Sequence, residues 1–308
     1  MTRSVASTVA GRPAKSGAFD LAASKVAGLI ELTKPRITGM VLITAMAGFL
    51  LASGGHPDGR RLLSSVIGTA LVTAGAQALN QLLERKTDAL MRRTENRPLP
   101  SGRIQSSEAL FFGAAAAVGG VAILALAVNF LTSLLSVAAL VCYLFLYTPL
   151  KRKTPLSTMV GAVPGAIPPV LGWTAARGEL GPGALALFSI LFFWQLPHFM
   201  AIGWMYRDDY ARAGFPMIPV LDRTGGRTAR HTVGWSLALL LASFLPTIFG
   251  VAGPFYLAAA VVLGFVFLCF CIGLARTRTA PAARLVLLSS VVYLPSLLVL
   301  MLLDRAAP

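Results

Sequence analysis

Long apolar segments follow one another along almost the whole chain, separated by short polar stretches. A transmembrane helix needs about 20 predominantly apolar residues, and about nine segments approach or reach this length. They are residues 37–53, 62–82, 109–128, 131–147, 156–176, 184–205, 232–250, 254–274 and 284–303. Only 13% of the 308 residues are charged, roughly half the share in soluble proteins. The sequence therefore predicts an all-α polytopic membrane protein with about nine transmembrane helices.

Three prolines, Pro164, Pro168 and Pro169, interrupt the fifth segment. Proline removes a backbone donor and kinks a helix, which is tolerated in a membrane where neighbouring helices or a cavity satisfy the freed carbonyls. Glycines stand beside the prolines at positions 161, 165 and 172. We therefore expect a bent, closely packed helix here and a cavity surrounded by the nine helices.

The basic residues divide unequally between the two sides of the predicted bundle. With the N-terminus inside, the outer segments hold 4 of the 27 Lys and Arg residues, namely Arg60, Arg61, Arg177 and Arg305, and the inner segments hold the other 23. Such an excess marks the cytoplasmic side. The net charge of +15 therefore reflects topology, and we expect no nucleic-acid partner. The pattern predicts a multi-pass protein of the cell inner (cytoplasmic) membrane, with the mitochondrial inner membrane as the alternative.

The first 25 residues are small, polar and basic, and they lack the apolar core of a signal peptide. We expect residues 1–25 to form a disordered cytoplasmic tail, and residues 26–308 to form a single transmembrane domain. The same composition, with no acid before Asp20, is also typical of a mitochondrial transit peptide.

Three oxygen-bearing side chains follow the second span at a regular spacing. Asn80, Glu84 and Asp88 are separated by four residues each, so they share one face if the helix continues out of the membrane. Oxygen ligands of this kind are those that Mg²⁺ prefers. The alternative is a solvated loop whose positive charge only sets the topology, because acids spaced by four residues are common on exposed helices.

Arginines follow this stripe, including Arg92 and Arg97. Guanidinium groups bind phosphate oxygens in a bidentate manner, so carboxylates and arginines together could bind a metal-bound diphosphate. The fourth span ends in Tyr147, with Lys151 and Arg152 after it. These cations are candidate phosphate ligands, and topology or contacts with lipid head groups would also account for them.

A second acidic pair, Asp208 and Asp209, follows the sixth span and precedes Tyr210. Adjacent carboxylates repel each other unless a cation lies nearby, so this pair is a second candidate for metal binding. The alternative is an ordinary helix cap. His198 lies within the sixth span, where an ionisable residue is a functional candidate, although a packing role would also account for it.

These motifs together resemble the UbiA-type membrane prenyltransferase superfamily, and within it the protohaem IX farnesyltransferase (haem O synthase) branch. The matching stretches are residues 32–36, 80–100, 147–152, 161–173, 194–199 and 209–220, which span most of the chain in family order. The branch usually reads Glu-Arg-Asp-x-Asp, and here Lys86 replaces the middle acid. Position 86 lies about 200° around the helix from Glu84, so we expect little loss of metal binding.

The resemblance implies transfer of a farnesyl group from farnesyl diphosphate to a vinyl group of protohaem IX, giving haem O. It implies Mg²⁺ as cofactor, and it implies hand-over of the product to haem A synthase or terminal oxidase assembly. The metal ligands would be Asn80, Glu84, Asp88, Asp208 and Asp209, with Lys151 as a further catalytic residue. The residues expected to contact the substrates are Arg92, Arg97, Tyr147, Arg152, His198 and Tyr210. His198 would ligate the haem iron or orient a propionate.

Other functions remain alternatives at this stage. A superfamily member acting on a quinone or chlorophyll precursor would share the metal site. A transporter is disfavoured, because transport requires polar residues along a pathway inside the spans and these spans are almost free of charge. An assembly factor would not need two acidic clusters.

Overall fold

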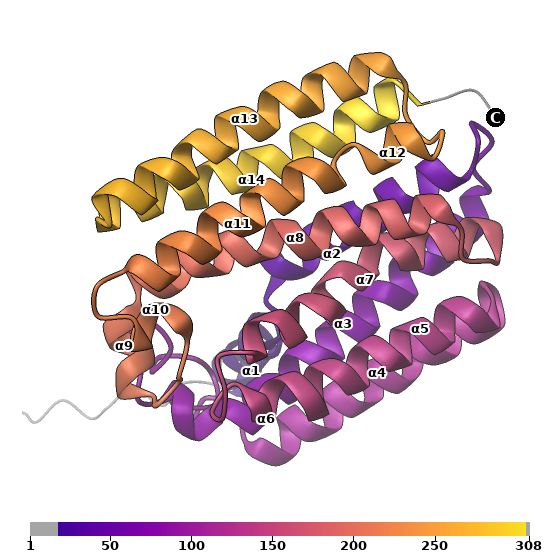
Figure 1. The fold of residues 1–308 in the computed structure, drawn as a ribbon. Coiled ribbons are helices and arrows are strands. Elements are labelled where there is room, and N and C mark those ends of the chain that lie inside the picture. The colour runs from indigo at the N-terminus through magenta and orange to yellow at the C-terminus, as the bar shows by residue number, and fades with distance from the viewer. Residues whose placement is uncertain (1–17, 306–308) are drawn as a thin grey trace, which may run out of the picture.

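The computed structural model describes residues 18–305, which form an all-helical bundle (Figure 1). Within this range, nine helices are long and apolar enough to cross a membrane. They are α2 (Pro35–Ala52), α3 (Gly59–Asp88), α4 (Ser106–Ala127), α5 (Phe130–Val141) with its continuation to Leu150, α7 (Ser157–Arg177), α8 (Pro182–Met205), α11 (Gly226–Ala242) with its continuation to Ile248, α13 (Pro254–Thr277) and α14 (Ala280–Leu303). Each falls on one of the nine predicted segments, so the predicted fold class is confirmed.

Two of the spans are composite. A π-helical segment, η1 (Cys142–Tyr147), and the short α6 (Thr148–Leu150) extend α5, and α12 (Leu245–Ile248) follows α11. Two further short helices, α9 (Arg207–Arg212) and α10 (Ile218–Leu221), lie between α8 and α11. Figure 1 places α6, α9 and α10 at the same end of the bundle, which is the end where α3 finishes.

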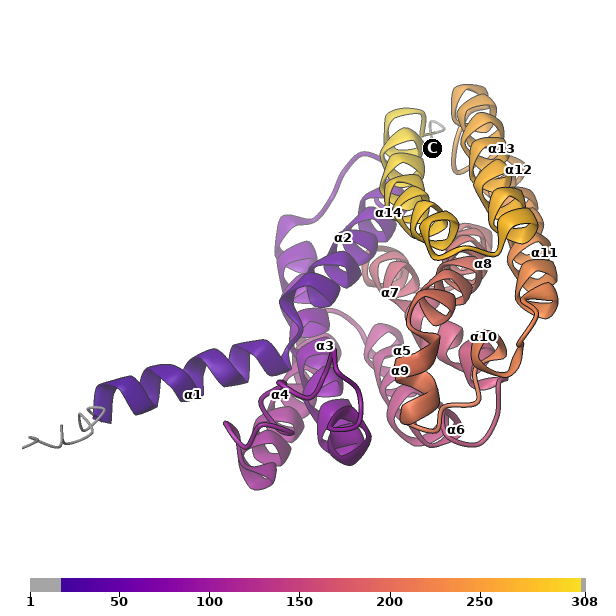
Figure 2. The same ribbon diagram turned by 90° about the vertical axis from the view of Figure 1, so that its left-hand side faces the viewer.

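Helix α1 (Ala18–Leu32) projects away from the bundle (Figure 2). It begins inside the segment predicted to be a disordered tail, of which residues 1–17 lie outside the described range. Ion pairs link it to the rest of the chain, from Glu31 to Arg103 at 2.8 Å and from Lys25 to Glu108. The tail prediction therefore differs from the structure at residues 18–25, because these long-range contacts are not visible in local composition.

The proline-rich helix α7 packs very closely against α2. A Cβ atom added at Gly172 would lie 1.8 Å from the carbonyl oxygen of Ala45, and one added at Gly48 would lie 2.0 Å from that of Pro169. Only glycine permits such a close approach of two backbones. The helix runs from Ser157 to Arg177 through all three prolines, and most of its residues are buried, which confirms the predicted close packing.

Helix α3 is the longest in the bundle, with 30 residues, and it extends six residues beyond the predicted end of its span at residue 82. Asp58 caps its start by accepting hydrogen bonds from the amides of Arg60 and Arg61. The helix thus continues through Glu84 to Asp88. Asn80, Glu84 and Asp88 therefore lie on one continuous helix, as the predicted stripe required.

Candidate active site

The stripe on α3 faces the interior of the protein. Asn80, Glu84 and Asp88 are respectively 1%, 8% and 1% exposed. Carboxylates are almost never buried without a partner, so these two must be held by cations or by a ligand. The alternative of a solvated loop is therefore wrong for these three residues, which lie buried on α3. Lys86 is exposed, which confirms that the departure from the usual acid points away from the stripe.

The amide of Asn80 has a defined orientation. Its Nδ2 donates to Thr148 Oγ1 at 3.1 Å, and the Thr148 hydroxyl donates in turn to the carbonyl oxygen of Tyr143 at 2.8 Å. Because the hydroxyl proton is used toward Tyr143, Thr148 accepts from the Asn80 amide nitrogen. The amide oxygen of Asn80 is therefore the atom left for a ligand on the α3 stripe.

Glu84 pairs with Lys151, which follows α6. The Lys151 Nζ atom lies 2.9 and 3.2 Å from the two carboxylate oxygens, and it also lies over the rings of Tyr147 at 4.8 Å and Phe215 at 5.8 Å. Burial alone would lower the pKa of this ammonium, but neighbouring Tyr147 and Glu84 raise the pKa above its ordinary value. Lys151 therefore remains charged.

Asp88 pairs with Arg97, which the loop after α3 brings back to the helix. The Arg97 Nη1 atom lies 2.8 Å from Asp88 Oδ2. Thr94 fixes this loop, because its hydroxyl donates to the Asp88 carbonyl oxygen at 2.7 Å. Among the described residues, Asp88 Oδ1 has no hydrogen-bond partner. One oxygen of this buried carboxylate is therefore available to a cation.

Lys34 is a further candidate residue, which belongs to the matching stretch 32–36 but was not among the predicted site residues. It lies at the corner between α1 and α2, with a left-handed backbone (φ 47°, ψ 67°). Strained backbone of this kind clusters at functional sites. The corner is fixed to α3, because Gln81 Nε2 donates to the Leu32 carbonyl oxygen at 2.8 Å. The signal in the sequence was a lysine directly before the proline that opens the first span.

The electrostatic surroundings of Lys34 join it to the same cluster. Burial and the neighbouring cations Arg97 and Lys151 lower its pKa to about 7, against the opposing effect of Glu84 and Asp88. Three cations and two carboxylates thus share this corner. An added anion would favour the charged form of Lys34.

The segment after α8 folds against the end of α3. Phe215 is buried with Met91 and Ala213 in a small apolar cluster, and the Arg93 guanidinium lies over the Tyr210 ring at 4.9 Å. The two predicted acidic segments, which are more than 100 residues apart in the sequence, therefore lie side by side.

The two carboxylates of the second segment differ in position. Asp209 is 14% exposed at the side chain and pairs with Arg212, whereas Asp208 is 89% exposed. The structure therefore turns only Asp209 inward. Within residues 18–305, no three acidic, histidine or cysteine side chains converge into a ready metal cage. The oxygen donors of the α3 stripe nevertheless fit Mg²⁺, which takes few protein ligands and keeps water or phosphate oxygens.

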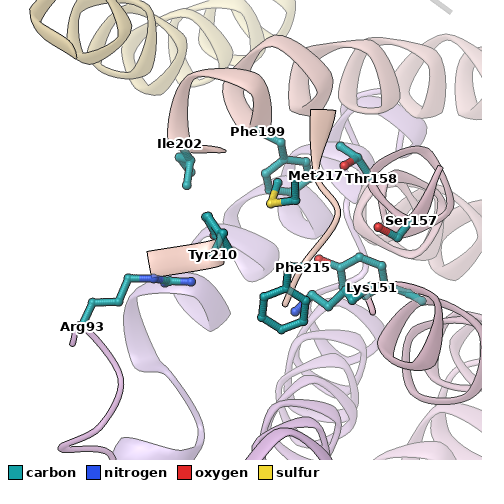
Figure 3. A pocket seen from close by; sticks show the side chains of 10 residues that line it. Arg93, Lys151, Ser157, Thr158, Phe199, Ile202, Tyr210, Phe215 and Met217 are labelled. Carbon is teal, nitrogen blue, oxygen red and sulfur yellow. The ribbon is translucent and has the colours of Figure 1, made fainter. Parts of the chain in front are cut away.

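A cavity of about 170 Å³ opens beside this cluster (Figure 3). Its lining residues are Arg93, Tyr147, Lys151, Ser157, Thr158, Phe199, Ile202, Tyr210, Phe215 and Met217. Predicted residues Tyr147, Lys151 and Tyr210 are among them. Arg92 and Arg152 are not, and both are exposed. Arg93, one residue from the predicted Arg92, is the arginine at the cavity.

His198 lies apart from the lining residues but next to one of them in sequence, Phe199 on α8. Its Nδ1 atom is 2.7 Å from the hydroxyl of Ser290 on α14. Its ring is partly buried and stacks on Trp194, with the ring centres 5.0 Å apart. The structure thus places it at the contact between α8 and α14, outside the set of residues that line the cavity.

Comparison with known proteins identifies the family of the chain. The model of the UbiA prenyltransferase family matches residues 41–292, so the chain belongs to this family. Protoheme IX farnesyltransferase of Solibacter usitatus is 47% identical over 285 residues, covering 90% of this chain and 98% of that protein. The enzyme of the same name from Koribacter versatilis is 44% identical, covering 89% and 92%. Within the family, the chain groups with the protohaem IX farnesyltransferases.

Solved structures share the fold. A structure described as digeranylgeranylglyceryl phosphate synthase superimposes with a TM-score of 0.76 at 18% identity, covering 91% of this chain and 98% of that one. A UbiA homolog from Archaeoglobus fulgidus, bound to GPP and Mg²⁺, gives a TM-score of 0.63 at 15% identity, covering 89% and 99%. The chain is thus a multi-pass membrane protein with the UbiA fold.

Proposed function

We propose that the protein transfers a farnesyl group from farnesyl diphosphate to a vinyl group of protohaem IX, forming haem O and releasing diphosphate. The observation that carries this proposal is the pairing of buried Glu84 and Asp88 with half-buried Lys151 and Arg97, in a chain 47% identical to a protoheme IX farnesyltransferase. Carboxylates and cations buried together at a membrane edge suit a metal-bound diphosphate.

The reaction requires a stabilised leaving group. The C1–O bond of the farnesyl ester breaks with both electrons going to diphosphate, and positive groups held in place in a water-poor site favour this step. Lys151, Arg97 and Lys34 supply such charge at the cluster, with Arg93 at the cavity. Asn80, Glu84, Asp88 and Asp209 would hold Mg²⁺, which when bound supplies further positive charge to the phosphate oxygens.

The remaining steps involve carbon. The vinyl group attacks C1 of the allylic cation with its π electrons, and the new cation on the haem side takes up water and loses a proton. Aromatic and apolar side chains, including Phe199, Phe215 and Met217, line the cavity beside the cluster and exclude water from the first cation. The cavity is smaller than a typical pocket for a whole ligand, about 300–1,000 Å³. It therefore suits the diphosphate end of the substrate.

Both substrates are largely apolar and partition into the bilayer, which explains a site among membrane helices. The distribution of basic residues supports a cytoplasm-facing site in the cell inner membrane. The added farnesyl chain increases the apolar surface, at about 0.8 kcal/mol for each buried CH₂ group. Haem O would therefore remain in the membrane, where a haem A synthase or terminal oxidase assembly would receive it.

The direct test is incubation of the purified protein with protohaem IX, farnesyl diphosphate and Mg²⁺, followed by mass spectrometry of the porphyrin. We expect haem O, and none when Mg²⁺ is chelated. Prenylation of a quinone precursor, with the porphyrin left unmodified, would contradict the proposal.

Lys34→Ala is expected to raise the KM for farnesyl diphosphate by about tenfold, because the variant loses one charge-assisted contact worth roughly 1.5–3 kcal/mol. Arg36→Ala is the matched control, since Arg36 is exposed two residues away and its variant should keep the wild-type KM. Initial rates over a range of farnesyl diphosphate concentrations measure both. Equal KM values for the two variants would remove Lys34 from the site.

Asp209→Asn is expected to lower turnover by about a hundredfold, whereas Asp208→Asn should stay within about twofold of wild type. The adjacent residues have the same chemistry, but only Asp209 is turned inward. Haem O formation at saturating substrate measures the difference. A larger loss from Asp208→Asn would show that the outward-facing carboxylate is the one used.

A further inference from the structure

The contacts of His198 fix the position of its proton. Its Nδ1 atom lies 2.7 Å from Ser290 Oγ, and that same Oγ lies 2.6 Å from the carbonyl oxygen of Leu287. Two oxygens this close repel each other unless a proton lies between them. The Ser290 hydroxyl has a single proton and therefore donates it to Leu287. Ser290 must then accept from His198, so Nδ1 carries the imidazole proton.

The orientation of the ring is fixed as well. Trp194, one helical turn before His198 on α8, stacks on the imidazole with an interplanar angle of 28°. The Trp194 Nε1 atom donates to the backbone carbonyl of Ser290 at 2.8 Å. A single residue of helix α14, Ser290, thus contacts both Trp194 and His198, and Ser290 is 0% exposed. Such outer contacts are those that set the tautomer and direction of a metal-ligating histidine.

The other nitrogen of the ring is left with a lone pair. Among residues 18–305, Nε2 of His198 has no hydrogen-bond partner, and the side chain is only partly buried. A nitrogen without a proton cannot donate to a carboxylate, so this tautomer does not suit binding of a propionate. The same lone pair is the usual protein ligand of haem iron.

We infer that His198 Nε2 is an axial ligand of the iron in the acceptor porphyrin. This inference rests on the proposed function, and it chooses between the two roles that the sequence left open. His198 lies seven residues before the end of α8 at Met205, about 10 Å deeper in the bundle. Phe199, the next residue on α8, lines the cavity beside the diphosphate cluster. Iron fixed at that depth would direct an edge of the porphyrin toward the cavity.

The test is a comparison of haem binding in the full-length protein and in His198→Asn. The asparagine amide can replace the Nδ1–H donor to Ser290, but it is a poor iron ligand. We expect wild type with protohaem IX to show the absorption and resonance Raman features of an axial imidazole. The variant should lose these features and bind haem at least about tenfold more weakly, while exogenous imidazole should restore them. Ser290→Ala should weaken haem binding by roughly tenfold.

Metal-free protoporphyrin IX distinguishes ligation from packing. If His198 binds iron, wild type and His198→Asn should bind this porphyrin equally well. An equal loss of affinity for haem and for the metal-free porphyrin would overturn the inference, as would an unchanged haem spectrum in a variant that folds normally. If the wild-type protein forms haem O but shows no imidazole features, the assignment of His198 as a ligand is wrong and the proposed function stands. Wild type that neither binds nor farnesylates haem overturns the proposed function as well.

Discussion

Asp88→Asn is expected to lower the rate of haem O formation by about a thousandfold while the protein remains in the membrane at its normal level. The buried carboxylate has one oxygen paired with Arg97, and its other oxygen has no partner among residues 18–305 and can bind Mg²⁺. Asparagine keeps the shape but removes the charge, so stabilisation of the departing diphosphate falls by several kcal/mol. Product formation by mass spectrometry, normalised to protein in washed membranes, measures the effect.

Lys86→Ala is the control for this variant. Lys86 lies on the same helix two residues earlier but is exposed, so its replacement should change the rate by less than about twofold. Lys86→Asp, which restores the acid usual in the branch, should likewise leave the rate near wild type. Wild-type turnover by Asp88→Asn would remove the α3 stripe from the mechanism.

The second large effect is expected at Lys151. Lys151→Met should lower turnover by a factor of about 10²–10³, because this ammonium lies within 3.2 Å of both Glu84 oxygens and lines the cavity. Methionine keeps the apolar stem and removes the charge. Lys153→Met, in the same loop but exposed, is the matched control and should retain activity.

A structural explanation for this loss can be separated from a catalytic one. Removing Lys151 leaves the largely buried Glu84 without its cation, which by itself is destabilising. The double variant Lys151→Met/Glu84→Gln removes both charges and should recover stability without recovering turnover. Thermal unfolding in detergent and the rate of haem O formation give the two readouts. Recovery of turnover in the double variant would mean that Lys151 acts only as a partner for Glu84 and that Glu84 does not hold Mg²⁺.

Much of this architecture is determined locally. Nine apolar segments of sufficient length must each cross the bilayer as helices, because backbone polar groups have no other partners there. The four-residue spacing of Asn80, Glu84 and Asp88 likewise places them on one face of any helix. These predictions needed no knowledge of distant contacts, and the structure of residues 18–305 confirms nine helices of spanning length and the shared face.

Side-chain direction in the loops was not determined locally. The sequence treats Arg92 and Arg93, or Asp208 and Asp209, as equivalent, and only the packing of the loop after α8 against the end of α3 distinguishes them. Lys34 joins the cluster because Gln81 fixes the corner before α2. No regular backbone period relates sequence spacing to direction in the loop after α3, and the period of the short α9 (Arg207–Arg212) does not say which of its faces packs inward.

The sequence by itself therefore determined the membrane class, the number of spans and the acidic stripe on α3. The tertiary structure decided which cations meet that stripe, and it decided the tautomer of His198 through Ser290, 92 residues away. The physical reason is that helix periodicity fixes neighbours within a single element. Hydrogen bonds and ion pairs between elements depend on how the whole bundle packs.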